Sequence, residues 1–277
     1  MSLRDLMRRL LADRSPEPPL PSAPPAPQPP MRTDPGLRDA VLSGWFLNAT
    51  GELFRGFPVT GDDIVLDVGC GDGGNANFCA SRGAALILAD IDPHKIAAAV
   101  RRLDGSAARS IMPLVSDANP LPLPDGAASR IVSTEVIEHV DDPTQFLSEL
   151  VRVGRPGALY LLTVPDPVAE TLQKDVAPQS YFEKPNHVRI VGRDEFARMV
   201  TEAGLVIERR DSCGFYWSIW WLLFWPANTS AENPNSPLLE NWAKTWDSLL
   251  ETPQAAQMQK VFDGLMPKTQ IIIARKP

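Results

Sequence analysis

Four glycines follow a short apolar run and are the residues of this chain best spaced to hold a nucleotide. The run 64–68 has the length and composition of a strand, and Gly69, Gly71, Gly73 and Gly74 come where such a strand would turn into a helix. Because glycine lacks a Cβ, the backbone can approach a ligand closely, and the following helix N-terminus offers unpaired N–H groups to negative charge. The spacing predicts a nucleotide-binding turn, which dinucleotide dehydrogenases also have.

Three carboxylates accompany this turn. Asp67 lies two residues before the first glycine, where it would repel a pyrophosphate and attract the cationic methionine end of S-adenosylmethionine (SAM). Asp90 lies in the apolar run 84–91, about twenty residues beyond the glycines, where ribose hydroxyls are commonly held. Asp117 follows a third run, 111–116. The ends of parallel strands share one edge of a sheet, so we expect the three carboxylates to converge on one ligand.

The segment VLDVGCGDG resembles the first motif of class I SAM-dependent methyltransferases of the type 11-like small-molecule kind. The resemblance extends over roughly 65–211 and includes HVRIVGRDEFARMVTEAGL, which is similar to a later signature of that family. It implies a Rossmann-like α/β fold with a seven-stranded, mainly parallel sheet whose last strand is antiparallel. It also implies SAM as the cofactor and an enzyme that transfers a methyl group.

The resemblance further implies which residues hold SAM. Asp117 would accept from the adenine amino group, and Ala118 would offer its backbone N–H. The expected cofactor residues are Asp67, Gly69, Cys70, Gly71, Asp90, Ile91, Asp117, Ala118 and Glu135.

Two histidines are the candidate catalytic bases, because imidazole titrates near working pH. His139 lies in EVIEHV, just past the fourth predicted strand (128–136), and His187 lies in a long polar segment after the fifth (158–165). For His187, a structural role with a bond to the backbone is an equal alternative.

The same two histidines, with Glu135 and Glu138, resemble a Mg²⁺-binding E-x-x-E-H…H arrangement of ubiquinone-pathway O-methyltransferases and small-RNA 2′-O-methyltransferases. Oxygen and imidazole ligands suit a metal that positions two acceptor hydroxyls. The E-H-V sequence is also common in metal-free relatives, so Mg²⁺ is the less favoured alternative.

An aromatic run, FYWSIWWLLFW at 215–225, departs from the family pattern. Apolar residues would surround any helix drawn through it, so it is either buried, or covers an apolar ligand, or contacts lipid. It opens a helical insert, and a self-contained cap on the acceptor side is favoured over membrane contact. We expect an apolar or lipid-like acceptor, with the candidate substrate-binding residues Trp45, Tyr181, Phe182, Trp217 and Trp221.

The remaining organisation follows from composition and periodicity. Residues 37–54 are expected to form helical cover, which by resemblance would bring Trp45 near the acceptor; core packing is the favoured alternative. The predicted parts are a basic amphipathic helix (1–14) that lies on a membrane, docks a partner helix or frays, a Pro-rich linker (15–36), the SAM-binding core (37–212), the Trp-rich insert (213–267) and the final strand (268–277).

Composition limits the classes of function. The chain has 277 residues, is 44% hydrophobic and carries a net charge of −7, which suits one α/β domain with appendages and argues against general nucleic-acid binding. Three cysteines without metal-ligand spacing favour a reduced cytoplasmic protein. We expect no signal peptide and no membrane span, but peripheral membrane contact through 1–14 or 215–225 stays an alternative.

Two rival functions remain from the sequence. A dehydrogenase would bind NAD(H), but Asp67 and an antiparallel last strand argue against it. A non-catalytic scaffold or membrane-associated interaction protein of the same fold would bind SAM weakly or not at all. The acceptor, and whether its O, N or C atom is methylated, stay open because one fold hosts many acceptors.

Overall fold

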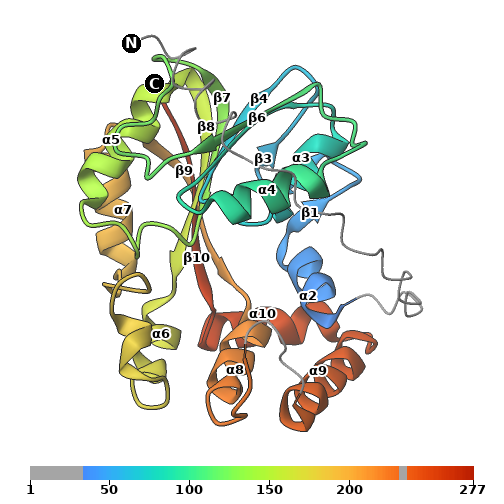
Figure 1. The fold of residues 1–277 in the computed structure, drawn as a ribbon. Coiled ribbons are helices and arrows are strands. Elements are labelled where there is room, and N and C mark those ends of the chain that lie inside the picture. The colour runs from blue at the N-terminus through green and yellow to red at the C-terminus, as the bar shows by residue number, and fades with distance from the viewer. Residues whose placement is uncertain (1–33, 231–235) are drawn as a thin grey trace, which may run out of the picture. The chain divides into compact units, whose positions relative to one another are not determined.

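A seven-stranded sheet forms the centre of the computed structural model (Figure 1), which describes residues 34–230 and 236–277. The strand order is β6-β5-β4-β7-β8-β10-β9, and β10 runs antiparallel to both of its neighbours while β4 to β8 are parallel. The strands are β4 (Ile64–Val68), β5 (Ala85–Asp90), β6 (Ser110–Val115), β7 (Ala128–Thr134), β8 (Gly154–Pro165), β9 (Val206–Cys213) and β10 (Thr269–Arg275). The predicted sheet is therefore confirmed, whereas the predicted helix at 1–14 and nearly all of the 15–36 linker lie outside the described residues.

Helices cover both faces of the sheet (Figure 1). Helices α5 (Pro143–Val153) and α7 (Arg193–Glu202) pack on one face, and α3 (Gly74–Ser81) and α4 (Pro93–Arg102) pack on the other. In β4, Leu66 and Val68 belong to the first core and Val65 to the second, because successive strand residues point to opposite faces.

Four helices begin with the same Asp-Pro pair. The aspartate side chain accepts the backbone N–H of the second helical residue, and proline fills the first position, where no N–H is needed. The pattern opens α2 (Pro35–Ser43), α4, α5 and α6 (Pro167–Gln173). Local sequence thus sets where these four helices begin.

The prediction of helical cover over 37–54 is wrong in its second half. Helix α2 ends at Ser43, and β1 (Trp45–Leu47), β2 (Glu52–Phe54) and β3 (Phe57–Pro58) form a small antiparallel sheet. Gly44 ends the helix because it adopts a φ of 107°, which favours glycine. The aromatic residues that follow suit a strand at least as well as a helix.

The insert folds into three helices around its own aromatic core (Figure 1). They are α8 (Phe215–Phe224), α9 (Pro237–Leu250) and α10 (Ala255–Leu265), and they contact one another and α2. Phe215, Tyr216 and Trp246 are buried at their centre. The expected helical, aromatic-rich insert is confirmed. Within the described ranges, no helix has the length and apolarity needed to cross a membrane.

Candidate active site

A cavity of about 770 Å³ lies where the parallel strands β4, β5, β6 and β7 end. Six of the nine predicted cofactor residues line it, and so does one of the two candidate bases. These residues are Gly69, Gly71, Asp90, Ile91, Asp117, Ala118 and His139. We call this the large cavity.

The glycine turn brings backbone to the wall of the large cavity. Gly69 has a φ of 70°, and a Cβ on it would lie 2.3 Å from Cγ2 of Val136, so no larger side chain fits without displacement. Gly71 has a φ of 54°, but its Cβ would meet nothing within 4 Å. Gly69 therefore allows close packing against Val136, which follows β7, and Gly71 leaves the cavity open.

Backbone N–H groups hold the two carboxylates at the ends of β5 and β6. Asp90 accepts from Gly71 N at Oδ2 and from Asp92 N at Oδ1, both at 2.9 Å. Asp117 Oδ1 accepts from Asn119 N at 3.0 Å. Ala118 has a φ of 60°, and its N–H, expected to face adenine, donates to Ser116 Oγ at 3.0 Å.

Asp67 is the least satisfied group of the turn. Its side chain is buried, and neither carboxylate oxygen has a hydrogen-bond partner among the described residues. Burial, and then the charge of Asp90, raise the pKa of Asp67 to about 7. A buried carboxylate without a partner fits a ligand that brings a positive charge, as the methionine end of SAM would. The Cys70 thiol is also buried, and burial raises its pKa to about 12.

A second, smaller cavity of about 240 Å³ lies beside the first and is walled by indole and phenyl rings. We call it the aromatic pocket. It brings together the predicted Trp45 and Trp217 with Glu135, which was expected to bind the cofactor. It is lined by Asp39, Ala40, Ser43, Trp45, Phe46, Asn75, Thr134, Glu135, Thr163, Cys213, Gly214, Trp217, Lys268 and Thr269.

Glu135 is fixed at the floor of the aromatic pocket. Its Oε2 accepts from Lys268 Nζ at 3.1 Å, and its Oε1 accepts from Thr163 Oγ1 at 2.9 Å and Thr269 Oγ1 at 3.3 Å. Its backbone has a φ of 55°, an uncommon conformation for a residue with a side chain. Burial alone would lower the pKa of Lys268, but the charges of Glu135 and Glu170 raise it, so the ammonium stays protonated.

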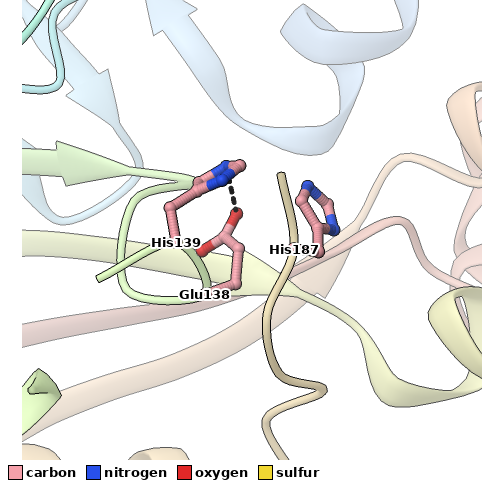
Figure 2. A group of neighbouring side chains, drawn as sticks. All are labelled: Glu138, His139 and His187. Atoms are coloured by element: carbon pink, nitrogen blue, oxygen red, sulfur yellow. Dashed lines mark ion pairs between the residues drawn. The ribbon is translucent and has the colours of Figure 1, made fainter. Parts of the chain in front are cut away.

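Glu138, His139 and His187 form the one group within the described ranges whose ligand atoms could hold a metal ion (Figure 2). These atoms lie within 4.8 Å of one another. The fourth predicted ligand, Glu135, lies outside the group. Neither oxygen of the buried Glu138 has a hydrogen-bond partner among the described residues, although Oε1 lies 3.8 Å from His139 Nε2 (Figure 2). Burial, then the charge of Glu135, raise the pKa of Glu138 well above its ordinary value.

Each of the two histidines has its Nδ1 within hydrogen-bond distance of an oxygen atom. His139 Nδ1 lies 3.1 Å from Pro185 O, and His187 Nδ1 lies 2.8 Å from Glu170 Oε2. With both Nδ1 atoms engaged, each imidazole has its Nε2 left for a proton or a metal. Burial, then the charge of His187, lower the pKa of His139, which favours the neutral form of that imidazole.

Lys268 and Glu170 were absent from the sequence predictions. Neither belongs to a motif, and each contacts a predicted residue from another element: Lys268 contacts Glu135, 133 positions away, and Glu170 contacts His187, 17 positions away. By contrast, the predicted Tyr181, Phe182 and Trp221 line neither cavity. Tyr181 packs instead against Phe182, His187 and Trp225, and Trp221 packs against neighbouring rings of α8.

The sequence is similar to known proteins over this core. Residues 66–162 match the family model described as a methyltransferase domain. A Mycolicibacterium smegmatis protein named "Probable S-adenosylmethionine-dependent methyltransferase" is 31% identical over 152 residues, 55% of this chain and 54% of that one. A 2-methyl-6-phytyl-1,4-hydroquinone methyltransferase of Synechocystis is 30% identical over 154 residues, 51% of this chain and 46% of that one. The chain thus spans about half the length of the curated relatives it matches.

Solved structures share the fold. Geranyl diphosphate C-methyltransferase from Streptomyces coelicolor superposes with a TM-score of 0.53 at 16% identity, covering 84% of this chain and 75% of that one. Residues 66–162 are thus similar to a methyltransferase domain, and the chain shares the fold of solved methyltransferases.

Proposed function

We propose that this protein transfers the methyl group of SAM to an O, N or C atom of a small, apolar or lipid-like acceptor. The observation that carries the proposal is the large cavity, where a glycine turn and the ends of β5 and β6 present Asp90 and Asp117 to one space, above the unpartnered Asp67. SAM, when bound, supplies an electrophilic methyl group on a sulfonium. The methylated atom gains a bond to carbon, the sulfonium loses one, and an acceptor proton leaves.

In this proposal the chain's own residues hold SAM, orient the acceptor and remove its proton. Asp67 faces the cationic end of the cofactor, Asp90 the ribose hydroxyls and Asp117 the adenine amine. His139 or His187 takes the acceptor proton at Nε2, since Nδ1 of each is engaged. Most of the acceleration comes from holding acceptor and methyl group within attack distance in a site that the helical insert shields.

Two observations support an apolar acceptor. The aromatic pocket has three aromatic residues in its lining, and one of them, Trp217, comes from the insert. The Synechocystis relative carries a phytyl hydroquinone in its name. The burial of Phe215 and Tyr216 within the aromatic core favours α8 as a cap on the acceptor side over contact with a membrane.

Calorimetric titration of the whole protein tests the proposal. We expect SAM and S-adenosylhomocysteine to bind with micromolar affinity and NADH not to bind. Asp90→Ala should abolish binding, because its carboxylate also fixes the Gly71 N–H, whereas the exposed Asp104→Ala should not change it. No binding of either adenosyl ligand would overturn the enzyme proposal and favour a non-catalytic scaffold.

A metal-dependent O-methyltransferase is the second candidate. The observation that favours it is Glu138, whose buried carboxylate oxygens have no hydrogen-bond partner among the described residues. Glu138, His139 and His187 would hold the ion, and the ion would position and polarise acceptor hydroxyls. Titration of the protein with Mg²⁺ alone should then release heat that Glu138→Gln removes and Glu240→Gln, at an exposed position, does not. Absence of Mg²⁺ binding would leave the metal-free reaction.

A further inference from the structure

We infer that the aromatic pocket is the acceptor site and that it selects a neutral acceptor whose flat apolar body ends in a hydroxyl group, recognised by the Glu135–Lys268 pair. This inference rests on the proposed methyl transfer. It adds a place for the acceptor, a chemical class, and two residues that determine specificity.

The position of the pocket relative to the large cavity is the first support. Thr134 and Glu135 line the aromatic pocket, while the next residue, Val136, lines the large cavity and packs against the glycine turn. Asn75, in the first turn of the helix that follows the glycines, also lines the aromatic pocket and donates to Thr134 Oγ1 at 3.1 Å. The two cavities therefore adjoin at the end of β7, where an acceptor held in the aromatic pocket can present its reacting atom to the methyl group and to His139 in the large cavity.

Backbone strain marks the same two cavities. Four residues other than glycine within the described ranges have a clearly positive φ, and three of them line these cavities: Phe46 and Glu135 the aromatic pocket, and Ala118 the large cavity. Such conformations cost on the order of 1–3 kcal/mol each and are retained mainly at functional sites. At Glu135 the strained backbone is held by its N–H, which donates to both O and Oγ1 of Thr163 at 3.1 Å.

The walls of the pocket suit a flat ring. Trp45 packs against Phe54 with ring centroids 5.0 Å apart, and Trp217 packs against Trp220 at 5.6 Å, so neither indole is free to rotate away. Trp217 also lies directly on Gly36, where a Cβ would approach to 2.3 Å. Rigid indole faces favour planar apolar bodies over branched ones.

The charges at the floor favour a neutral polar group. Lys268 Nζ lies 3.1 Å from Glu135 and 3.9 Å from Glu170, so two carboxylates already surround this one ammonium. A carboxylate acceptor would meet Glu135 at once, and an ammonium acceptor would compete with Lys268 for the same oxygens. A hydroxyl both donates and accepts, and the pair offers it an acceptor oxygen and an ammonium donor together.

A matched set of naphthalene probes tests the inference. Titration calorimetry of the protein, saturated with S-adenosylhomocysteine, should give at least about tenfold tighter binding of 2-naphthol than of naphthalene, 2-naphthoate or 2-naphthylmethylamine. Equal binding of naphthalene, or tighter binding of the carboxylate or the amine, would overturn the hydroxyl selection. If S-adenosylhomocysteine itself does not bind, the proposed methyl transfer fails, and the same titration without it still tests the pocket.

Two variants locate the binding. Glu135→Gln should weaken the binding of 2-naphthol at least about tenfold and leave the binding of naphthalene unchanged, because it removes only the charged oxygen that accepts a hydrogen bond. Trp217→Leu should weaken both probes, because it removes a wall. Glu240→Gln, an exposed glutamate of α9, is the matched control and should change neither. If circular dichroism shows that Glu135→Gln does not fold, Thr269→Val is the substitute. It removes one hydroxyl that orients Glu135, and it should weaken the binding of 2-naphthol but not of naphthalene. Unchanged 2-naphthol affinity in the folded Glu135→Gln, Trp217→Leu or Thr269→Val protein would overturn the assignment.

Discussion

The large cavity and the aromatic pocket share the end of β7 but are built in different ways. The large cavity takes its walls from the ends of consecutive parallel strands and the turns after them. The aromatic pocket takes its walls from α2, β1, the start of α3, the ends of β7, β8 and β9, the start of α8 and the start of β10. The lining of the first includes two glycines and five aspartates, and the lining of the second includes three aromatic residues and the Glu135–Lys268 ion pair.

This difference teaches which perturbations should separate cofactor binding from acceptor binding. The strand ends meet wherever the parallel sheet forms, so the large cavity needs only the central fold. The aromatic pocket also needs α2 and α8 to be docked, and α2 packs on α9 and α10. Changes in the cap should therefore act on the acceptor and spare the cofactor.

Loss of the central indole of the cap should have the largest effect. Trp246 is fully buried, stacks among Phe215, Trp242 and Phe262, and donates from Nε1 to Asp39 Oδ1 at 3.0 Å. Trp246→Ala should lower the free energy of unfolding by about 3–5 kcal/mol, measured by urea denaturation. It should also weaken the binding of 2-naphthol, measured by calorimetry. Equal losses of S-adenosylhomocysteine affinity in the folded variant would contradict the separation.

The converse experiment acts on the glycine turn. In Gly69→Ala the new Cβ would meet Val136 in a left-handed backbone, so S-adenosylhomocysteine affinity should fall about a hundredfold. Gly71→Ala is the matched control, since its Cβ meets nothing and only the backbone term remains. Calorimetry should rank the two variants in that order, and the reverse order would mean that packing against β7 does not shape the cavity.

The buried hydrogen bonds that Asp39 of α2 accepts from Trp246 and Gln259 of the insert should make stability depend on pH. Burial, opposed by the Gln259 hydrogen bond and reinforced by Asp263, raises the pKa of Asp39 from 3.8 to about 7. The folded state therefore binds a proton that the unfolded state releases, so this contribution to stability is complete below about pH 4 and is lost as pH rises through about 7. In thermal melts, Asp39→Asn should flatten this fall, because Trp246 and Gln259 both donate to one oxygen that asparagine retains. A melting profile that keeps the wild-type pH slope would assign the fall to other groups.

The smallest effect should come from one methyl group placed under the pocket wall. In Gly36→Ala the Cβ would lie 2.3 Å from Cζ2 of Trp217, so the indole must shift and 2-naphthol should bind a few-fold more weakly. Gly264→Ala adds the same methyl to α10, where it meets nothing, and should raise stability by about 1 kcal/mol without changing binding. Equal 2-naphthol affinity in both variants would show that Trp217 does not shape the acceptor site.

Much of the fold could be predicted because its signals are local. The Asp-Pro pairs fixed helix starts, apolar runs fixed strands, and a glycine with positive φ could be anticipated where a strand turns into a helix. The segment 45–54 was mispredicted because its aromatic residues fit a helix face and a strand equally well. Which of these forms depended on Gly44 and on pairing with β2 and β3.

The sequence by itself determined the proposed cofactor site: the glycine turn, the three carboxylates, and their shared edge, because a parallel sheet aligns its strand ends whatever surrounds them. Only the tertiary structure decided the proposed acceptor site. Glu135 was expected among the cofactor residues, yet it pairs with Lys268 and lines the aromatic pocket. That pairing joins positions 133 residues apart, and no local pattern of charge or hydrophobicity encodes a contact of that range.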